Sequence, residues 1–320
     1  MSVRLRKSFT RREALGGAFA VTAAAIGARG EVTRPKGPIV ESHIHLFASD
    51  QKKFPYAANA PYKPAPIPVE EYVQFAREAR IDRAVIVHPE PYQNDHRYLE
   101  YCFQHEPSPM FFKGTCLFDP TAPDTPDRIS TIVGLNPGRI VALRIHEMRK
   151  RGQPPLLSGP IHDRDLSDPH MKATWKRVGE LGLAIQMHFV PWFAPAIGQL
   201  AGQFESIPMI LDHLGREGMG TPEDAANVLK LAKLPRCYLK FSGVEYSSKE
   251  KFPYRDVKPW VRKAYDAFGP DRIIWGTLGH DMAEFQKQVE LFDFMFDFAN
   301  EADREKIRGG NALKLFHWSR

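Results

Sequence analysis

An alternation of short apolar segments with longer amphipathic segments is the feature of this sequence that most constrains its fold. Eight short runs rich in apolar and β-branched residues recur from residue 38 onward: Ile39–Leu46, Arg83–His88, Phe111–Cys116, Ile140–Ile145, Leu183–Phe189, Pro208–His213, Cys237–Ser242 and Arg272–Trp275. Between them, apolar residues return every three or four positions, as on one face of a helix. Strands that alternate with helices in this way favour an α/β fold with a parallel sheet and helical crossovers.

Eight strand–helix repeats are the number that closes a (β/α)8 TIM barrel. A doubly wound open sheet is the alternative arrangement of the same elements. The segment 31–320 shows no linker and no break in composition, so we predict that it forms a single domain.

The first 30 residues have the three parts of a secretory signal. A basic stretch comes first, made of Arg4, Arg6, Lys7, Arg11 and Arg12. An apolar run over 15–26 follows, too short to span a bilayer stably, with small residues over 23–28 for cleavage. The adjacent Arg11 and Arg12 favour twin-arginine export over an ordinary secretory signal or an uncleaved anchor. We predict that 1–30 is the export signal and that the mature barrel lies in a bacterial periplasm.

The positive charge of the chain belongs largely to that segment. The chain has 44 Lys and Arg against 38 Asp and Glu, a formal net charge of +6. Residues 1–30 hold six basic residues and one acid, a net +5, which leaves +1 for residues 31–320. Nucleic-acid binders concentrate basic charge on the folded domain. We therefore expect no nucleic-acid partner, and no membrane partner once the signal is removed.

The three cysteines, Cys102, Cys116 and Cys237, are an odd number without close spacing. They predict neither a disulfide framework nor a cysteine-rich metal site. Buried small apolar side chains are the better interpretation.

Two long connections follow predicted strands. Residues 47–68 follow the first strand, and residues 146–168 follow the fourth. Long loops in compact domains are usually lids or binding loops. Loops that follow the strands of a barrel lie on the face that carries active sites, so we expect both to shape a binding pocket.

Histidines gather at the ends of the predicted strands. His43 and His45 are two residues apart on the first strand, so they point to the same face, along with Glu41. His188 ends the fifth strand and His213 ends the sixth. Polar side chains inside an apolar barrel are costly unless they share a partner. The four imidazoles therefore predict metal ligands or proton carriers that titrate near neutral pH.

Three neighbouring side chains have a structural interpretation. His88 and His146 each end a strand alone, where a hydrogen-bonded structural histidine is the more common case. Asp212 directly precedes His213, so strand alternation places it on the opposite face. We predict a structural role for Asp212.

The strand-end motifs resemble those of the amidohydrolase-related (amidohydrolase 2) family of the amidohydrolase superfamily. The resemblance is carried by Glu41-Ser42-His43-Ile44-His45-Leu46-Phe47, His188, Asp212-His213-Leu214-Gly215-Arg216, Ile274-Trp275-Gly276-Thr277 and Gly309-Gly310-Asn311-Ala312-Leu313. It spans residues 38–318 with all elements in order. Within the family, Phe54-Pro55-Tyr56-Ala57 and Tyr254-Arg255-Asp256-Val257 are similar to segments of 2-pyrone-4,6-dicarboxylate hydrolase and related lactonases.

The resemblance to those lactonases implies a metal-free site that opens a carboxylated lactone. In such enzymes histidines polarise the carbonyl, which would be the role of His43, His45 and His188. An Asp at the end of strand eight activates water there, and His213 would support charge or proton transfer.

Arginines after strands four and six hold the substrate carboxylates in those enzymes, and Arg144 and Arg216 match them. A planar guanidinium binds a carboxylate in bidentate fashion. Ion pairs with loop acids are the alternative interpretation of both. Further substrate-binding candidates are Tyr56, Tyr254 and Lys150, with Arg149 or Arg151 as alternatives to Lys150.

Other members of the family are zinc-dependent decarboxylases and hydrolases. The positions of His43, His45 and His188 supply metal ligands in them, together with the strand-eight Asp. The expected cofactor is therefore either none or a single divalent metal such as Zn²⁺.

The strand-eight motif departs from the family pattern. Leu278 follows Trp275-Gly276-Thr277 where the Asp is expected, and leucine can neither bind a metal nor take a proton. Three interpretations remain open. In the first, a shifted loop supplies Asp281 or His280 as the base, although Asp281 is also a plain helix N-cap. In the second, three histidines bind zinc, and the zinc activates water. In the third, the barrel binds its ligand without catalysing a reaction.

The leading hypothesis is a hydrolase for a small anionic lactone or similar carbonyl compound, with Asp281 activating water. The alternatives are a zinc-dependent decarboxylase or hydrolase on the same fold, and a non-catalytic barrel that binds a carboxylated ligand.

Overall fold

Eight parallel strands form one nearly closed barrel in this computed structural model, which describes residues 35–318. They are β1 (Val40–Ile44), β2 (Arg83–Ile86), β3 (Phe112–Cys116), β4 (Ile140–Glu147), β5 (Ala184–Phe189), β6 (Met209–Leu211), β7 (Cys237–Phe241) and β8 (Ile273–Trp275). Each strand pairs with the next along the chain. The hydroxyl of Ser42 donates to the carbonyl oxygen of Trp275 and so links β1 to β8. All eight predicted strands are confirmed, and the strand order fits a TIM barrel and not a doubly wound sheet.

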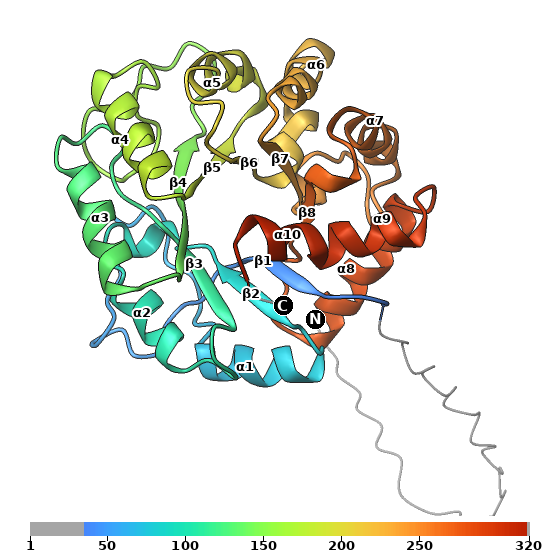
Figure 1. Ribbon diagram of the computed structural model, residues 1–320, viewed down its shortest axis with the longest axis horizontal. Helices are drawn as coiled ribbons and strands as arrows, with labels where there is room; N and C mark the ends of the chain where they lie inside the picture. The colour runs from blue at the N-terminus through green and yellow to red at the C-terminus, as the bar shows by residue number, and fades with distance from the viewer. Residues whose placement is uncertain (1–34, 319–320) are drawn as a thin grey trace, which may run out of the picture. The chain divides into compact units, whose positions relative to one another are not determined.

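A helix follows each strand and covers the outside of the barrel (Figure 1). These helices are α1 (Val69–Glu78), α2 (Arg97–Gln104), α3 (Thr125–Leu135), α4 (Pro169–Glu180), α5 (Ala194–Ala201), α6 (Pro222–Lys230), α7 (Lys258–Phe268) and α8 (Met282–Met295). Two short helices, α9 (Glu301–Glu305) and α10 (Asn311–Leu315), complete the described chain. The expected spacing is visible in α1, where Val69, Tyr72, Val73 and Ala76 are buried on one face.

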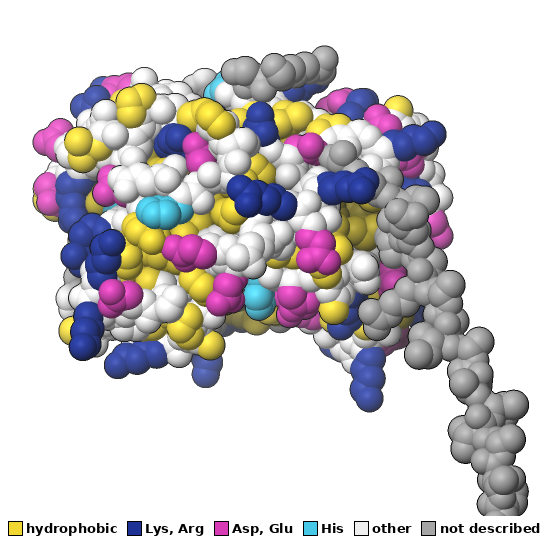
Figure 2. All heavy atoms as spheres, turned by 90° about the horizontal axis from the view of Figure 1, so that it is seen from below, with side chains coloured by type: hydrophobic (Ala, Val, Ile, Leu, Met, Phe, Trp, Pro, Cys, Tyr) yellow, Lys and Arg dark blue, Asp and Glu magenta, His cyan; other side chains and the backbone are white. Residues whose placement is uncertain are grey.

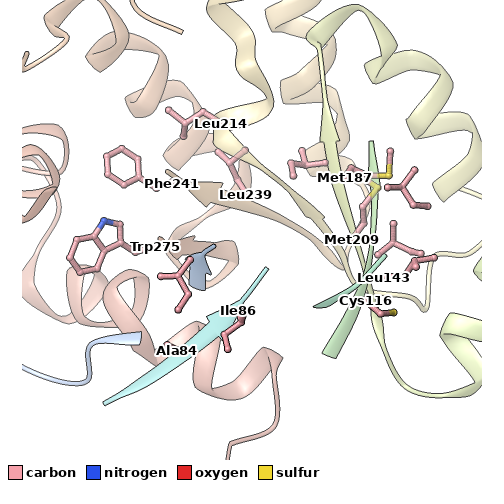
Figure 3. Close-up of a cluster of buried hydrophobic side chains, with 14 of the residues drawn as sticks. Ala84, Ile86, Cys116, Leu143, Met187, Met209, Leu214, Leu239, Phe241 and Trp275 are labelled. Carbon is pink, nitrogen blue, oxygen red and sulfur yellow. The ribbon is translucent and has the colours of Figure 1, made fainter. Parts of the chain in front are cut away.

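Outward-facing strand side chains pack against this helical layer. Figure 3 shows Leu143, Met187, Leu239 and Trp275 among the members of that buried cluster. The cysteines Cys102, Cys116 and Cys237 are free and buried, as predicted. Because these alternate strand residues point outward, their neighbours must point into the barrel.

The interior of the barrel is apolar at its N-terminal end. Val40, Val85, Ile210 and Ile274 form one buried cluster there with Phe316. The ammonium group of Lys113 donates to the carbonyl oxygen of Phe316 at 2.7 Å. In Figure 1 α10 lies across the barrel next to β1. The C-terminal segment therefore covers this end of the barrel.

One face of the described surface carries charges of both signs. On the face shown in Figure 2, basic and acidic side chains are interspersed. No helix within residues 35–318 is long and apolar enough to cross a bilayer. The predicted export signal, residues 1–30, lies outside the described residues, so it stays a prediction.

Candidate active site

The four predicted imidazoles converge at the C-terminal end of the barrel. The Nε2 atoms of His43 and His45 lie 3.3 Å apart. The ring centroid of His213 is 4.6 Å from that of His43 and 5.4 Å from that of His188. Residues from β1, β5 and the end of β6 thus meet in one cluster, which we call the imidazole cluster.

His146, on β4, is a fifth imidazole beside this cluster. Its ring centroid is 4.9 Å from that of His188, and its Nδ1 lies 3.0 Å from a carboxylate oxygen of Glu90. His88, by contrast, is stacked on His96 and pairs with the carbonyl oxygen of Gln93 at 2.9 Å. The structural interpretation thus suits His88, whereas His146 borders the site.

The prediction that Asp212 points away from this face is wrong. Its carboxylate lies 3.6 Å from Nδ1 of His43, 3.0 Å from the guanidinium of Arg144 and 3.2 Å from the ammonium of Lys240. Gln186 donates to it at 3.0 Å. All five side chains are buried, so Asp212 is the central anion of a polar network below the imidazoles.

The backbone after β6 explains this error. His213, Leu214, Gly215 and Arg216 have φ angles of 53°, 57°, 65° and 49°. Strand alternation therefore stops at Asp212, and the chain turns so that consecutive polar side chains face the same cluster. Left-handed backbone costs a non-glycine residue about 1–2 kcal/mol, and such strain is concentrated at functional sites.

Burial lowers the pKa of every imidazole in the cluster. The pKa of His45 falls to about 3 through burial and the nearby charge of Arg144. Burial likewise holds the pKa of His43, His188 and His213 well below its ordinary value. These rings are neutral at pH 7, so each has one nitrogen that can accept a proton.

Most of the predicted arginines already have carboxylate partners. The pairs are Arg144 with Asp212, Arg149 with Glu147 and Arg151 with Asp224. The ion-pair interpretation, offered for Arg144 and Arg216, holds for Arg144, whose partner Asp212 directly follows a strand. Arg216 forms no ion pair with any carboxylate within residues 35–318, and it reaches the cluster through a 2.7 Å contact between its Nη2 and Nε2 of His188.

Glu41 joins the two edge strands of the barrel. Its buried carboxylate accepts from the backbone N–H of His43 at 2.8 Å and from that of Thr277 at 2.8 Å. Burial raises its pKa to about 7. Glu41 therefore fastens the end of β1, which carries His43, to the loop after β8.

The structure does not bring Asp281 into the imidazole cluster. Its exposed carboxylate accepts from the backbone N–H of Glu284 at 2.9 Å and caps α8. Within the described chain it has no hydrogen bond, ion pair or metal-suited grouping with the four imidazoles. Leu278, where the resemblance led us to expect an Asp, has a left-handed φ of 63°. The geometry favours the capping role of Asp281.

The remaining predicted substrate-binding residues, Tyr56, Lys150 and Tyr254, do not contact the imidazole cluster within residues 35–318. Tyr56 packs against Phe47, and its hydroxyl donates to the carbonyl oxygen of Pro64 at 3.2 Å. Lys150 is exposed. Tyr254 lines a crevice of about 220 Å³ together with Leu278. None of these three residues has a hydrogen bond, ion pair or ring contact with the four imidazoles within residues 35–318.

Sequence reasoning missed two residues that contact this site. Lys240 is a charged residue within an apolar strand run, a signal that could have identified it. Tyr246, in a short 3-10 turn (Val244–Tyr246), has its ring centroid 5.2 Å from that of His213. Nothing in the local sequence distinguishes Tyr246 from other loop tyrosines.

The tautomers decide which residues could hold a divalent metal. His45 Nδ1 lies 2.7 Å from the carbonyl oxygen of Val87, so that nitrogen carries the hydrogen and Nε2 keeps its lone pair. The carboxylate beside Nδ1 of His43 favours the same tautomer. In these tautomers the Nε2 lone pairs of His43 and His45 face each other. Their Nδ1–H groups point to the carboxylate of Asp212 and the carbonyl oxygen of Val87, and such partners orient metal-binding histidines. His43 and His45 therefore fit a metal, as does the group of His43, Asp212 and His213, whose ligand atoms lie within 4.8 Å of one another.

The predicted ligand set of His43, His45 and His188 is incomplete in this arrangement. Nε2 of His188 faces the guanidinium of Arg216, which has only hydrogens to offer. That nitrogen is free for a metal only if Arg216 moves.

This arrangement defines the class of (β/α)8-barrel proteins that carry their functional groups at the C-terminal ends of the strands. The family model described as Amidohydrolase matches residues 40–318, and the chain belongs to this family.

Two curated relatives are similar over most of the chain. The 4-sulfomuconolactone hydrolase of Hydrogenophaga intermedia is 27% identical over 86% of this chain and 88% of its own. The protein of the same name from Rhizobium radiobacter is 28% identical over 88% of this chain and 90% of its own. A crystal structure described as a probable 2-pyrone-4,6-dicarboxylic acid hydrolase from Acinetobacter baumannii, with citric acid bound, superposes with a TM-score of 0.67 at 20% identity, covering 88% of this chain and 99% of that one.

Proposed function

We propose that this protein is a hydrolase that opens a small lactone bearing a carboxylate or similar anionic group. The observation that carries the proposal is the convergence of four neutral imidazoles at the C-terminal end of the barrel with Arg216, a guanidinium that pairs with no carboxylate of residues 35–318. The family membership and the relatives named as lactone hydrolases support it.

The chemistry needs a polarised carbonyl, an activated water and a proton for the leaving oxygen. The contacts above hold the ring hydrogens of His43 and His45 at Nδ1, and Nε2 of His188 accepts from Arg216. The donor that polarises the lactone carbonyl is therefore the N–H of His213, and Arg216 holds the anionic group. Water attacks the carbonyl carbon, the ring C–O bond breaks, and the proton removed from water passes to the leaving oxygen. The product is the open-chain acid.

His43 is the imidazole best placed to take the proton from water. Its pKa is low, so the ring is neutral before the reaction. The carboxylate of Asp212 lies 3.6 Å from its Nδ1 and stabilises the charge that the ring gains. This is how a carboxylate supports a histidine base in hydrolytic enzymes.

The proposal is tested with purified protein and three lactones: 4-sulfomuconolactone, 2-pyrone-4,6-dicarboxylate and an uncharged sugar lactone. We expect acid release from at least one anionic lactone and none above the blank from the uncharged one. Binding of the anionic lactones without turnover of any would instead support the non-catalytic barrel.

Replacing Asp281 with asparagine tests whether Asp281 or His43 takes the proton from water. Asparagine caps helices as well as aspartate does, so we expect turnover and melting temperature to remain near wild type. Steady-state kinetics on the preferred lactone measures the effect. A loss of about 10²–10⁴-fold, the size of a general-base contribution, would make Asp281 the base.

A zinc-dependent hydrolase or decarboxylase is the second candidate, favoured by the facing Nε2 lone pairs of His43 and His45. A bound zinc ion would lower the pKa of a water molecule. Elemental analysis of protein purified without added metal decides between the two versions. Stoichiometric zinc would overturn the metal-free site.

We also propose that residues 1–30 direct the folded protein to the periplasm by the twin-arginine route. The support is the pair Arg11 and Arg12 ahead of a short apolar run. Cell fractionation of the Arg11→Lys, Arg12→Lys double variant is the test, and we expect it to stay in the cytoplasm.

A further inference from the structure

Glu90 is a carboxylate beside the imidazole cluster that the proposed chemistry does not use. It begins a short 3-10 turn, Glu90–Tyr92, that follows β2. One of its carboxylate oxygens lies 3.0 Å from Nδ1 of His146, and its side chain is 17% exposed. The ring centroid of His146 is in turn 4.9 Å from that of His188. Glu90 therefore adjoins the cluster through His146 and can be reached from solvent.

The negative charge of Glu90 has no guanidinium or ammonium partner. No Lys or Arg of residues 35–318 forms an ion pair with it. The basic side chains whose charge acts on it have carboxylate partners of their own, in the pairs Arg144–Asp212 and His162–Asp163. Although burial acts to raise the pKa of Glu90, His146 and Arg144 lower it to about 2, so the carboxylate is ionised at pH 7. It can then only accept hydrogen bonds, and the oxygen away from His146 has no donor in the described chain.

Glu90 and Arg216 lie on opposite sides of the barrel. Glu90 follows β2 and Arg216 follows β6, which are four strands apart in an eight-stranded order. Figure 1 shows these two strands across the barrel from each other. Arg216 contacts His188 at 2.7 Å, and His188 packs against His146. The C-terminal end of the barrel thus has a cationic side and an anionic side, with imidazoles between them.

Hydrogen bonds hold the turn that carries Glu90. The carbonyl oxygen of Glu90 accepts from the backbone N–H of Gln93 at 2.8 Å and from its side-chain amide at 2.7 Å. The amide oxygen of Gln93 accepts in turn from the backbone N–H of Ile161 at 2.6 Å, in the long loop after β4. The turn is therefore fixed to its neighbours, and a ligand meets a carboxylate at this side of the site.

An ionised carboxylate distinguishes the groups of a ligand by their charge. A hydroxyl group can donate to the free oxygen of Glu90 in a charge-assisted hydrogen bond. A second carboxylate would face a like charge in a partly buried place, which costs affinity. An ammonium group would suit Glu90 but would come near the guanidinium of Arg144, so a neutral donor fits better.

We propose that Glu90 is a specificity-determining residue that selects a hydroxyl group on the side of the substrate away from its anionic group. The preferred substrate is then a lactone with one anionic group and a hydroxyl. Lactones with two anionic groups bind more weakly but are not excluded, because the penalty falls only on an anion that faces Glu90. The inference rests on the proposed function in taking the ligand to be an anionic lactone whose anion lies at Arg216.

The test uses three ring acids that differ at one position. Benzoate, 3-hydroxybenzoate and isophthalate carry hydrogen, hydroxyl and carboxylate there, and none has an ester bond to hydrolyse. Calorimetry at pH 7 measures their binding to the purified protein. In wild type we expect 3-hydroxybenzoate to bind at least about tenfold more tightly than benzoate, as for a hydrogen bond to a charged group. Isophthalate should bind more weakly than benzoate because of the like charge.

Replacing Glu90 with glutamine keeps the shape of the side chain and removes its charge. We expect isophthalate to bind Glu90→Gln about tenfold or more tightly than wild type, since the repulsion is gone. The advantage of 3-hydroxybenzoate over benzoate should fall by about threefold or more, because a hydrogen bond to a neutral acceptor is weaker. Benzoate itself should change least.

Glu180→Gln is the matched control, because Glu180 is exposed on α4 and pairs with Lys176 and Arg177 there. It should match wild type for all three acids. Equal binding of isophthalate and 3-hydroxybenzoate by wild type would overturn the inference, as would no binding of 3-hydroxybenzoate or an unchanged isophthalate affinity in Glu90→Gln. If Glu90→Gln does not fold, the wild-type order of affinities decides. No turnover is measured, so this inference can fail while the lactone assay succeeds, and the reverse.

Discussion

Replacing Asp212 with alanine is expected to lower the free energy of unfolding by about 3–5 kcal/mol, the cost of breaking a buried ion pair from one side. Asp212 is the carboxylate beside both Arg144 and Lys240, and all three side chains are buried. Without it, two cations remain in the barrel with no anion in contact. Chemical denaturation at pH 7 measures the loss.

The pH dependence of this effect distinguishes it from a simple cavity. Burial lowers the pKa of Lys240 from its ordinary value. Without Asp212 the ammonium loses its main stabilising neighbour, so its pKa falls further and it sheds its proton as the pH rises. We expect Asp212→Ala to cost less stability at pH 9 than at pH 7.

Asp266→Ala is the control for this variant, because Asp266 pairs with Arg262 on the surface. Exposed ion pairs contribute about 0–1 kcal/mol. If Asp212→Ala does not fold, Asp212→Asn, which keeps an acceptor for Gln186, provides the measurement. A loss below about 1 kcal/mol in Asp212→Ala would contradict the buried network.

Replacing His43 with glutamine is expected to lower kcat/KM by about 10²–10⁴-fold, the range of general acid–base catalysis. His43 touches three components of the site: it faces His45, stacks near His213 and adjoins Asp212. Glutamine keeps polar atoms in the cavity but cannot take a proton at neutral pH. The measurement is turnover of the anionic lactone that wild type hydrolyses fastest.

His105→Gln is the matched control, since His105 is exposed and stacked on Tyr101 outside the barrel. It should retain wild-type kinetics. Thermal unfolding of His43→Gln should remain cooperative, which separates lost chemistry from lost folding. Turnover of His43→Gln within about threefold of wild type would place the reaction elsewhere, because a lost general base costs at least about 10²-fold.

The strands and the imidazole cluster could be predicted because both depend on local pattern. Apolar runs of strand length alternate with helical spacing, and a closed barrel is the way to bury eight of them. Side chains at the ends of parallel strands then meet at one end. His43, His45, His188 and His213 converge for this reason, although they lie far apart in the sequence.

The departures from prediction occur where a residue's role depends on its neighbours in space. Asp281 has the same sequence context whether it activates water or caps a helix, and only its partner, the N–H of Glu284, favours the cap. Arg144 and Arg216 both looked like carboxylate anchors, but only the closed barrel shows that Asp212 already pairs with Arg144. A charged residue within an apolar strand, such as Lys240, indicates that a partner exists, but the sequence of that strand does not say which residue the partner is.

The sequence by itself determined the eight strand–helix repeats and the end of the barrel at which the imidazoles lie. The tertiary structure alone decided that Asp212 faces inward and that, of Arg144 and Arg216, it is Arg216 that has no carboxylate partner within residues 35–318. The physical reason is the left-handed turn over residues 213–216, which ends strand alternation at the residue where the prediction relied on it. Its strain is sustained by packing from the rest of the barrel, so no local pattern could reveal it.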